Sequence, residues 1–198
     1  MWSDEYAESV GSNEFYPVRW ETLATAGPSF EVDLGVRLAR HFSLMAIWER
    51  AQLGAGPGTA NSLPMPPDGL ATDSTIESST SDFLALAGSF ESNPDHASLL
   101  VELAIGYRQA DCLWSDGTEL QLDGSLANGR LGIGASFRAT PTLSFAPMLT
   151  IENGVFTEAD WVYPDGSRQY ARSPRYAQGG YAIVGLQLGI HLDLMGRR

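Results

Sequence analysis

Apolar and polar residues alternate with a period of two along most of the chain, and the longest example is the stretch 181–194. Every second residue there is apolar from Ala182 to Leu194, whereas the residues between them are mainly small or polar, such as Gly185 and Gln187. A period of two places the two sets on opposite faces of a β-strand. About 9–11 alternating residues is the length of a tilted strand that crosses a bilayer. The pattern therefore predicts an all-β chain whose apolar face meets either lipid or protein.

The same alternation predicts six further strands. They cover residues 30–38, 42–53, 82–90, 98–109, 118–138 and 143–151. The phase of the longest one breaks near Ala127-Asn128-Gly129, which predicts a β-bulge there. The long connections are 54–81, 110–117 and 156–179, and the short ones are 39–41, 91–97 and 139–142. An antiparallel meander with long loops at one end and tight turns at the other is typical of transmembrane β-barrels.

Seven strands is an odd number, which affects how the sheet can close. The first and last of the seven run in the same direction, whereas antiparallel bacterial barrels of this type have an even number of strands. We therefore expect an eighth strand before Phe30, formed either by residues 15–23 or by a segment upstream of Met1. The expected organisation is an N-terminal loop or partial first strand over residues 1–29, an eight-stranded up-and-down barrel over 30–194 and a tail over 195–198.

The polar side of the predicted strands carries charges of both signs. In a small membrane barrel the apolar side chains face lipid and the alternate set fills the interior. Because acidic and basic residues occur at similar depths, we expect a narrow interior plugged by ion pairs. This lumen charge network is expected to contain Glu31, Asp33, Arg37, Glu102, Arg108, Arg130, Arg138, Glu152 and Asp193. In the core of a soluble sandwich, each unpaired ion would cost several kcal/mol.

A second interpretation turns the apolar face inward. The chain would then be a soluble, periplasmic, lipocalin-like barrel that binds an apolar ligand. In this alternative, Gln187 and Asp193 point outward, and the residues that point inward are Val184, Leu186, Leu188 and Ile190. The direction of these side chains distinguishes the two interpretations.

The amino-acid composition argues against several classes of function. The 198 residues are enough for one sizeable domain, and 24 acidic residues against 12 basic ones, all arginine, give a formal net charge of −12. This balance argues against a nucleic-acid partner, which needs a basic surface. Cys112 is the only cysteine, so the sequence contains no disulfide framework or cysteine-based metal site, and we expect an unreactive loop thiol.

Export signals are not evident in the sequence. The longest apolar run is shorter than the 18 residues of a transmembrane helix, and the acidic start Met1–Glu5 does not resemble a signal peptide. We therefore expect that an exported form either begins upstream of Met1 or has already lost its signal.

Two hairpin units resemble those of small bacterial outer-membrane β-barrel proteins, the broad OmpA/OmpX/opacity-like group. They are Leu34–Leu38 followed by Phe42–Leu44, and Gly134–Arg138 followed by Leu143–Phe145. The ending Gly180–Leu194 is similar to the closing strand of such barrels, which usually acts as the assembly signal. The resemblance implies a monomer in the bacterial outer membrane that contacts lipids, lipopolysaccharide and the barrel assembly machinery. It implies a structural or surface-interaction role without a cofactor, rather than a porin-like channel.

Some barrels of this group modify the acyl chains of lipid A, so a lipid-A-modifying outer-membrane enzyme is a second alternative. A hydrolytic site needs a histidine beside a serine and a carboxylate. His191 and Asp193 share the polar face of the last strand and are the only such pairing that the sequence suggests. Since no metal-binding or nucleophile motif is present, the prediction is no catalytic residue, no metal and no cofactor.

The long loops contain two candidate binding segments. Arg168, Arg172 and Arg175 place three guanidinium groups in the loop 156–179, where they can meet lipopolysaccharide phosphates or a sugar, or can simply be solvated. Four acidic residues that could recruit a divalent cation weakly are Asp68, Asp73, Glu77 and Asp82.

Overall fold

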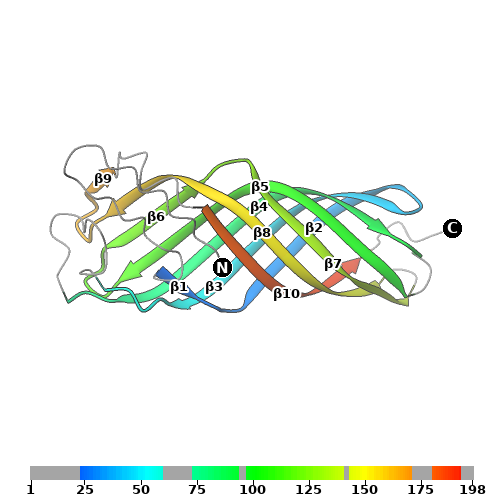
Figure 1. The fold of residues 1–198 in the computed structure, drawn as a ribbon, viewed down its shortest axis with the longest axis horizontal. Coiled ribbons are helices and arrows are strands. Elements are labelled where there is room, and N and C mark those ends of the chain that lie inside the picture. Colours follow the sequence, from blue (N-terminus) through cyan, green and yellow to red (C-terminus); the bar gives the residue numbers. More distant parts are fainter. Residues whose placement is uncertain (1–22, 60–72, 94–96, 141–142, 171–179, 193–198) are drawn as a thin grey trace.

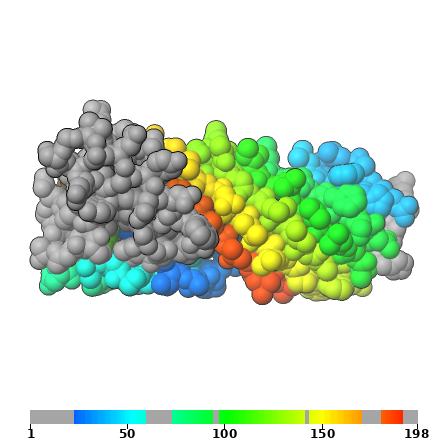
Figure 2. Space-filling view, in the orientation of Figure 1, coloured from blue at the N-terminus to red at the C-terminus, as the bar shows by residue number. Residues whose placement is uncertain are grey.

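In a computed structural model of the chain, the described residues are 23–59, 73–93, 97–140, 143–170 and 180–192. They form strands that join in one sheet, and every pairing between these strands is antiparallel. The sheet curls into an elongated, barrel-like body (Figures 1 and 2). The predicted all-β antiparallel fold is therefore confirmed.

The described residues contain ten strand segments. They are β1 (Ala24–Thr25), β2 (Ser29–Ala39), β3 (Phe42–Ala55), β4 (Ile76–Glu91), β5 (Ser98–Trp114), β6 (Glu119–Gly124), β7 (Asn128–Thr140), β8 (Leu143–Val162), β9 (Arg168–Tyr170) and β10 (Gly180–Leu192). Strands β6 and β7 both lie between β5 and β8, so they are two parts of one long strand. The strand is interrupted at residues 125–127, next to the position where the sequence predicted a β-bulge. Asn128, which follows it, is buried, and its Oδ1 accepts a hydrogen bond from the Val155 N–H at 3.0 Å.

Strands β2 and β10 form the two edges of the curled sheet. Among the described residues, β2 has a backbone ladder only with β3, and β10 only with β8, and the meander makes the two edges run in the same direction. Their Cα atoms approach within 8 Å. Residues 15–22 of the expected first strand lie outside the described residues, whereas Leu23 is buried and its carbonyl accepts a hydrogen bond from Ser79 Oγ at 2.8 Å.

Three strands extend further than the sequence predicted. Strand β4 begins at Ile76 instead of Asp82, β5 reaches Trp114 instead of Gln109, and β8 reaches Val162 in the region assigned to a loop. The short β9 also lies in that predicted loop. The apolar residues change sides along these strands, so the alternation on which the prediction relied is interrupted where the strand continues. On β5 the outward, odd-numbered residues are apolar from Leu99 to Ile105 and polar at Gln109 and Asp111. The inward residues Ala110, Cys112 and Trp114 are all apolar.

This change of sides divides the sheet into two parts. The turn half, nearest the short connections, comprises β2, β7, β10 and residues 42–49, 83–91, 98–108 and 143–152. The loop half comprises β1, β6, β9 and residues 50–55, 76–82, 109–114 and 153–162. In Figure 1, β6 and β9 lie toward the left end and β7 toward the right end. The outer face of the turn half is apolar, and its inner face carries charged residues together with buried apolar ones such as Met45, Ile47 and Ala85. The loop half has an apolar interior and a mostly polar outer face.

Candidate functional site

Two arginines lie at the centre of the inner face. Arg108 on β5 and Arg130 on β7 have side chains that are 2 % and 1 % exposed. Arg108 donates two parallel hydrogen bonds to Glu152, from Nε to Oε1 at 2.5 Å and from Nη2 to Oε2 at 2.6 Å. Such a bidentate, charge-assisted pair is stronger and more directional than a single contact. Tyr181 on β10 adds a hydrogen bond from its hydroxyl to Glu152 Oε1 at 2.7 Å.

Arg130 connects a second set of carboxylates. Its Nη2 donates to Glu102 Oε1 at 2.8 Å, and its Nη1 donates to Glu49 Oε2 at 3.0 Å and to Glu31. The Gln187 amide of β10 donates to Glu31 and Glu49, both at 3.1 Å. These contacts join β2, β3, β5, β7 and β10 across the interior.

The register of the sheet explains why these side chains meet. Glu31, Glu49, Phe83 and Arg108 lie opposite one another on four neighbouring strands. On the far wall, Arg130 lies opposite Glu152. The Phe83 ring lies between the two cations, 4.9 Å from Arg108 Cζ and 5.4 Å from Arg130 Cζ. A guanidinium within about 6 Å of a ring centroid is attracted by the ring quadrupole.

Acidic groups outnumber basic groups in this cluster. Two guanidinium groups face five carboxyl groups, those of Glu31, Asp33, Glu49, Glu102 and Glu152. Three buried atoms of this cluster have no hydrogen-bond partner among the described residues: Asp33 Oδ1, Arg130 Nε and Gln187 Oε1. The cluster contains cross-linking ion pairs but no serine–histidine pair, so it can hold strands together and block the interior. We call these seven charged residues, with Gln187, the inner network.

Six of the nine predicted network residues lie in this cluster: Glu31, Asp33, Glu102, Arg108, Arg130 and Glu152. Arg37 lies apart from this cluster and pairs at 3.5 Å with Glu91 near the short turns. Arg138 also lies further toward the turns, opposite Ser144, and none of the contacts described above includes it. Asp193 lies outside the described residues.

The charge network predicted from the sequence lacks Glu49, which contacts both arginines. Its Oε1 lies 3.5 Å from Arg108 Nη2, and its side chain is 9 % exposed. The signal was present, because Glu49 alternates with Leu44, Ala46 and Trp48, which were assigned to the outer face.

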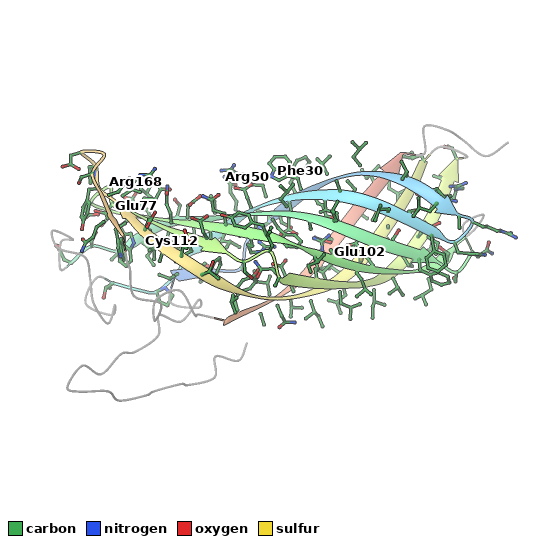
Figure 3. All side chains as sticks on the ribbon, turned by 90° about the horizontal axis from the view of Figure 1, so that it is seen from above. Phe30, Arg50, Glu77, Glu102, Cys112 and Arg168 are labelled. Atoms are coloured by element: carbon green, nitrogen blue, oxygen red, sulfur yellow. The ribbon has the colours of Figure 1, made fainter. Side chains whose placement is uncertain are left out.

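The outer face of the turn half is apolar and exposed on every long strand. The exposed fraction reaches 76 % for Leu34 on β2 and 64 % for Leu103 on β5. On β10, Val184, Leu186, Leu188 and Ile190 are 63–84 % exposed, whereas Gln187 points inward to the inner network. This direction is opposite to the one that the lipocalin-like interpretation requires. In Figure 3, Phe30 points away from the sheet and Glu102 lies between its walls.

The loop half contains an ordinary apolar core. It consists of Leu23, Ile76, Ala110, Cys112, Trp114, Leu120, Leu122, Phe156, Ala159, Trp161 and Tyr181. Cys112 is fully buried within β5, so its assignment to a loop was wrong. Burial raises the pKa of its thiol to about 11, which makes it a poor nucleophile at neutral pH.

Strands β8 and β9 form a hairpin in the region predicted to be a long loop. Gly166 adopts φ +80°, and Asp165 Oδ1 accepts hydrogen bonds from the Ser167 N–H at 2.8 Å and hydroxyl at 2.6 Å. The hairpin places Arg168 on the surface at one end of the molecule (Figure 3). Arg172 and Arg175, the other two predicted contacts, lie outside the described residues.

Candidate catalytic and metal-binding groups are sparse in the part of the chain that the structure describes. His41 Nδ1 is 2.8 Å from the carbonyl oxygen of Glu91 at a short turn, whereas the side chain of His191 and the whole of Asp193 fall outside this part. The described residues contain no group of three histidine, cysteine or acidic side chains that could hold a metal ion. They also contain no helix that is long and apolar enough to cross a membrane.

Comparison of the chain with protein-family models, with curated proteins and with solved structures found no match. The functional argument therefore depends on the two faces of the sheet and on the inner network.

Proposed function

We propose that this chain is a transmembrane β-barrel protein of a bacterial outer membrane, similar in organisation to the OmpA/OmpX/opacity-like group. Its role is structural or surface-interacting: it occupies the membrane, keeps its lumen blocked with the inner network and presents the loop half outside the bilayer. The partners that this role implies are membrane lipids, lipopolysaccharide and the barrel assembly machinery.

The main support for this proposal is the exposed apolar outer face of the turn half, which surrounds the inner network. We call this face the apolar belt. On β2 alone, five successive outward residues are apolar and 46–76 % exposed: Phe30, Val32, Leu34, Val36 and Leu38. They span about 27 Å of strand at ~3.4 Å per residue, or about 20 Å of height at a tilt of ~40°. A soluble monomer rarely exposes so large a contiguous apolar surface. Lipid is the environment in which such a belt is stable.

Closing the barrel requires a partner for the free edges of β2 and β10. An unpaired backbone N–H or C=O in hydrocarbon costs several kcal/mol. Because the two edges run in the same direction, one additional strand that is antiparallel to both satisfies them. We propose that one such strand lies between β2 and β10, which would then be about 10 Å apart, twice the usual strand spacing.

The loop half fits the aqueous side of such a barrel. Arg50, Gln52 and Glu77 are exposed on its outer face, and Trp48 and Tyr107 lie at the boundary with the apolar belt. Tryptophan and tyrosine are enriched at both membrane–water interfaces. The exposed Arg168 of the β8–β9 hairpin provides a guanidinium for anionic groups such as lipopolysaccharide phosphates.

The test is cell fractionation combined with gel migration of boiled and unboiled samples, with the protein expressed together with its upstream coding sequence. We expect the protein in the outer-membrane fraction, and we expect the unboiled form to migrate faster because the barrel stays folded in detergent. A protein that remains folded in the soluble fraction without detergent would contradict the proposal.

A further inference from the structure

Five carboxylates lie on the outer face of the loop half, directly beyond the apolar belt. They belong to three neighbouring strands: Asp111 of β5, Glu119 and Asp123 of β6, and Glu158 and Asp160 of β8. We call these five residues the acidic strip. None of the ion pairs between described residues includes a member of the strip.

The register brings the carboxylates close together. Asp123 lies directly opposite Glu158, and like charges in this position repel each other. Gln121 precedes Asp123 by two residues on β6 and lies farther from the apolar belt. It pairs with Asp111 of β5 on one side and with Asp160 of β8 on the other. The Gln121 amide donates to Glu119 Oε1 at 3.3 Å, so the amide does not neutralise either aspartate.

Asp160 gives an independent indication that a ligand is missing from the strip. Its neighbours Ala159 and Trp161 belong to the apolar core, so strand alternation directs Asp160 to the outer face. Nevertheless it is only 9 % exposed, and its Oδ1 has no hydrogen-bond partner among the described residues. At the other side of Gln121, the half-buried Asp111 accepts a side-chain hydrogen bond from Gln109, but its Oδ1 also has no partner among the described residues. Buried carboxylate oxygens without donors call for a bound ion or water.

The position of the acidic strip indicates which kind of ion it would bind. Tyr107 is the boundary residue of the belt on β5, and its hydroxyl donates to Asp123 Oδ1. In a barrel that spans a membrane, the strip therefore lies at the level of the lipid headgroups. Carboxylates facing anionic phosphates repel them unless cations lie between the two. Hard divalent cations such as Ca²⁺ and Mg²⁺ take carboxylate and phosphate oxygens as ligands.

We propose that the acidic strip binds divalent cations that bridge Asp111 and Asp160 to the phosphates of surrounding lipids. No three acidic side chains of the described residues converge into a complete metal site. The protein therefore supplies part of the coordination sphere, and phosphate and water oxygens supply the rest. The inference rests on the proposed membrane location.

The experiment measures how Ca²⁺ changes the melting temperature of the full chain in two environments, neutral detergent micelles and bilayers that contain phosphatidylglycerol. We expect a clear rise in the bilayers, reversed by a chelator, and a much weaker response in neutral detergent. Asp111→Asn and Asp160→Asn should each raise the Ca²⁺ concentration at half-effect by about tenfold, because fewer charged ligands weaken Ca²⁺ binding. Asp165→Asn is the matched control, because that aspartate accepts both of its hydrogen bonds from Ser167 at the hairpin tip, and it should leave the response unchanged.

The outcomes separate this inference from the proposed function. If the chain does not insert into bilayers, the proposed function fails first. If it inserts and shows the folded gel migration but Ca²⁺ acts equally on wild type, Asp111→Asn and Asp160→Asn, the cation site is overturned. An equally strong response in neutral detergent would overturn the bridging to lipid.

Discussion

The turn half and the loop half are built from the same strands, yet their two faces have opposite chemistry. Outside, Leu103 and Ile105 of the turn half give way along β5 to Gln109 and Asp111 of the loop half. Inside, the guanidinium of Arg108 is followed by Ala110, Cys112 and Trp114. The backbone hydrogen bonds between the strands continue across the boundary between the halves. A β-strand requires only that successive side chains point to opposite faces, whichever of the two faces is apolar. The chemistry of each face follows the environment it meets.

The two halves also depend on different interactions for stability. In the turn half the interior contains ion pairs whose partners come from five strands, beside two small apolar clusters that include Met45, Ile47 and Met148. In the loop half it is held by apolar contacts such as that between Trp114 and Trp161, with ring centroids 6.1 Å apart. The same type of substitution should therefore have different effects in the two halves.

The largest expected effect is the loss of a buried cation in the turn half. Arg130→Met leaves Glu31, Glu49 and Glu102 without their guanidinium, and breaking a buried pair by removing one partner costs about 3–5 kcal/mol. The matched control is Arg50→Met, because Arg50 forms an exposed pair with Asp82 at 3.6 Å. Such pairs contribute about 0–1 kcal/mol. Urea unfolding in detergent, followed by tryptophan fluorescence, measures both free energies, and equal losses would contradict the distinction between the halves.

A charge placed on the outer face should also distinguish the halves. Leu44→Arg puts a guanidinium in the apolar belt, and near the bilayer midplane this costs about 2–4 kcal/mol of folding free energy. Gln52→Arg makes the same kind of change on the same strand in the loop half, where water solvates the charge, and should cost less than about 0.5 kcal/mol. The readout is the urea midpoint of barrels folded into lipid vesicles. Similar midpoints for the two variants would show that the belt does not face lipid.

Removal of one methyl group gives a smaller effect that tests the cores. Ile76 is 5 % exposed in the apolar core of the loop half, so Ile76→Val should cost about 0.5–1.5 kcal/mol. Ile105 is 59 % exposed on the belt, and Ile105→Val should cost less than half as much because lipid chains fill the space. The same vesicle unfolding assay compares them, and a larger loss for Ile105→Val would reverse our assignment of the faces.

The smallest effect concerns the pH dependence of the loop half. Burial, with the nearby Glu119 charge, raises the pKa of Asp111 to about 6 in the folded protein. Because the folded state holds this proton more tightly than the unfolded state, Asp111 lowers stability as pH rises from about 4 to about 6. Asp111→Asn should therefore be more stable than wild type by about 0.5–1 kcal/mol at pH 7.5, after solvent screening, and equal to it near pH 4. Unfolding in the presence of a chelator checks this, and a constant difference across the pH range would exclude the titration.

The sequence predicted the turn half better than the loop half. The prediction of a strand over 30–38 corresponds to β2, Ser29–Ala39, because the apolar residues of this strand stay on its exposed outer face and alternate without interruption. The extensions of β4, β5 and β8 were missed because a method that follows one apolar set ends the strand where the apolar residues change faces. The apparent phase shift near Asn128 is also a change of faces: the apolar residues Leu120 and Leu122 face inward and Leu131 and Ile133 outward, although even-numbered residues point inward on both sides of the break.

Alternation was also insufficient for predicting which residues form the inner network. Alternation identifies the face of each side chain but not its depth, so Arg37 and Arg138 were grouped with Arg108 and Arg130 although they lie nearer the turns. Depth depends on register across neighbouring strands. The row Glu31, Glu49, Phe83 and Arg108 becomes visible only when the pairing is known.

Each long strand that crosses the boundary between the halves takes part in both. Before membrane insertion, such a chain exposes two apolar sets on opposite faces, for instance Ile105 and Trp114 of β5. The loop half can bury its set only when β4, β5, β6 and β8 lie side by side. If the apolar belt faces lipid, as we propose, those strands pair stably only after insertion. We therefore expect insertion and core formation to be one cooperative event without a stable half-folded intermediate. In transit to the membrane, the polypeptide would then depend on chaperones that keep both sets covered.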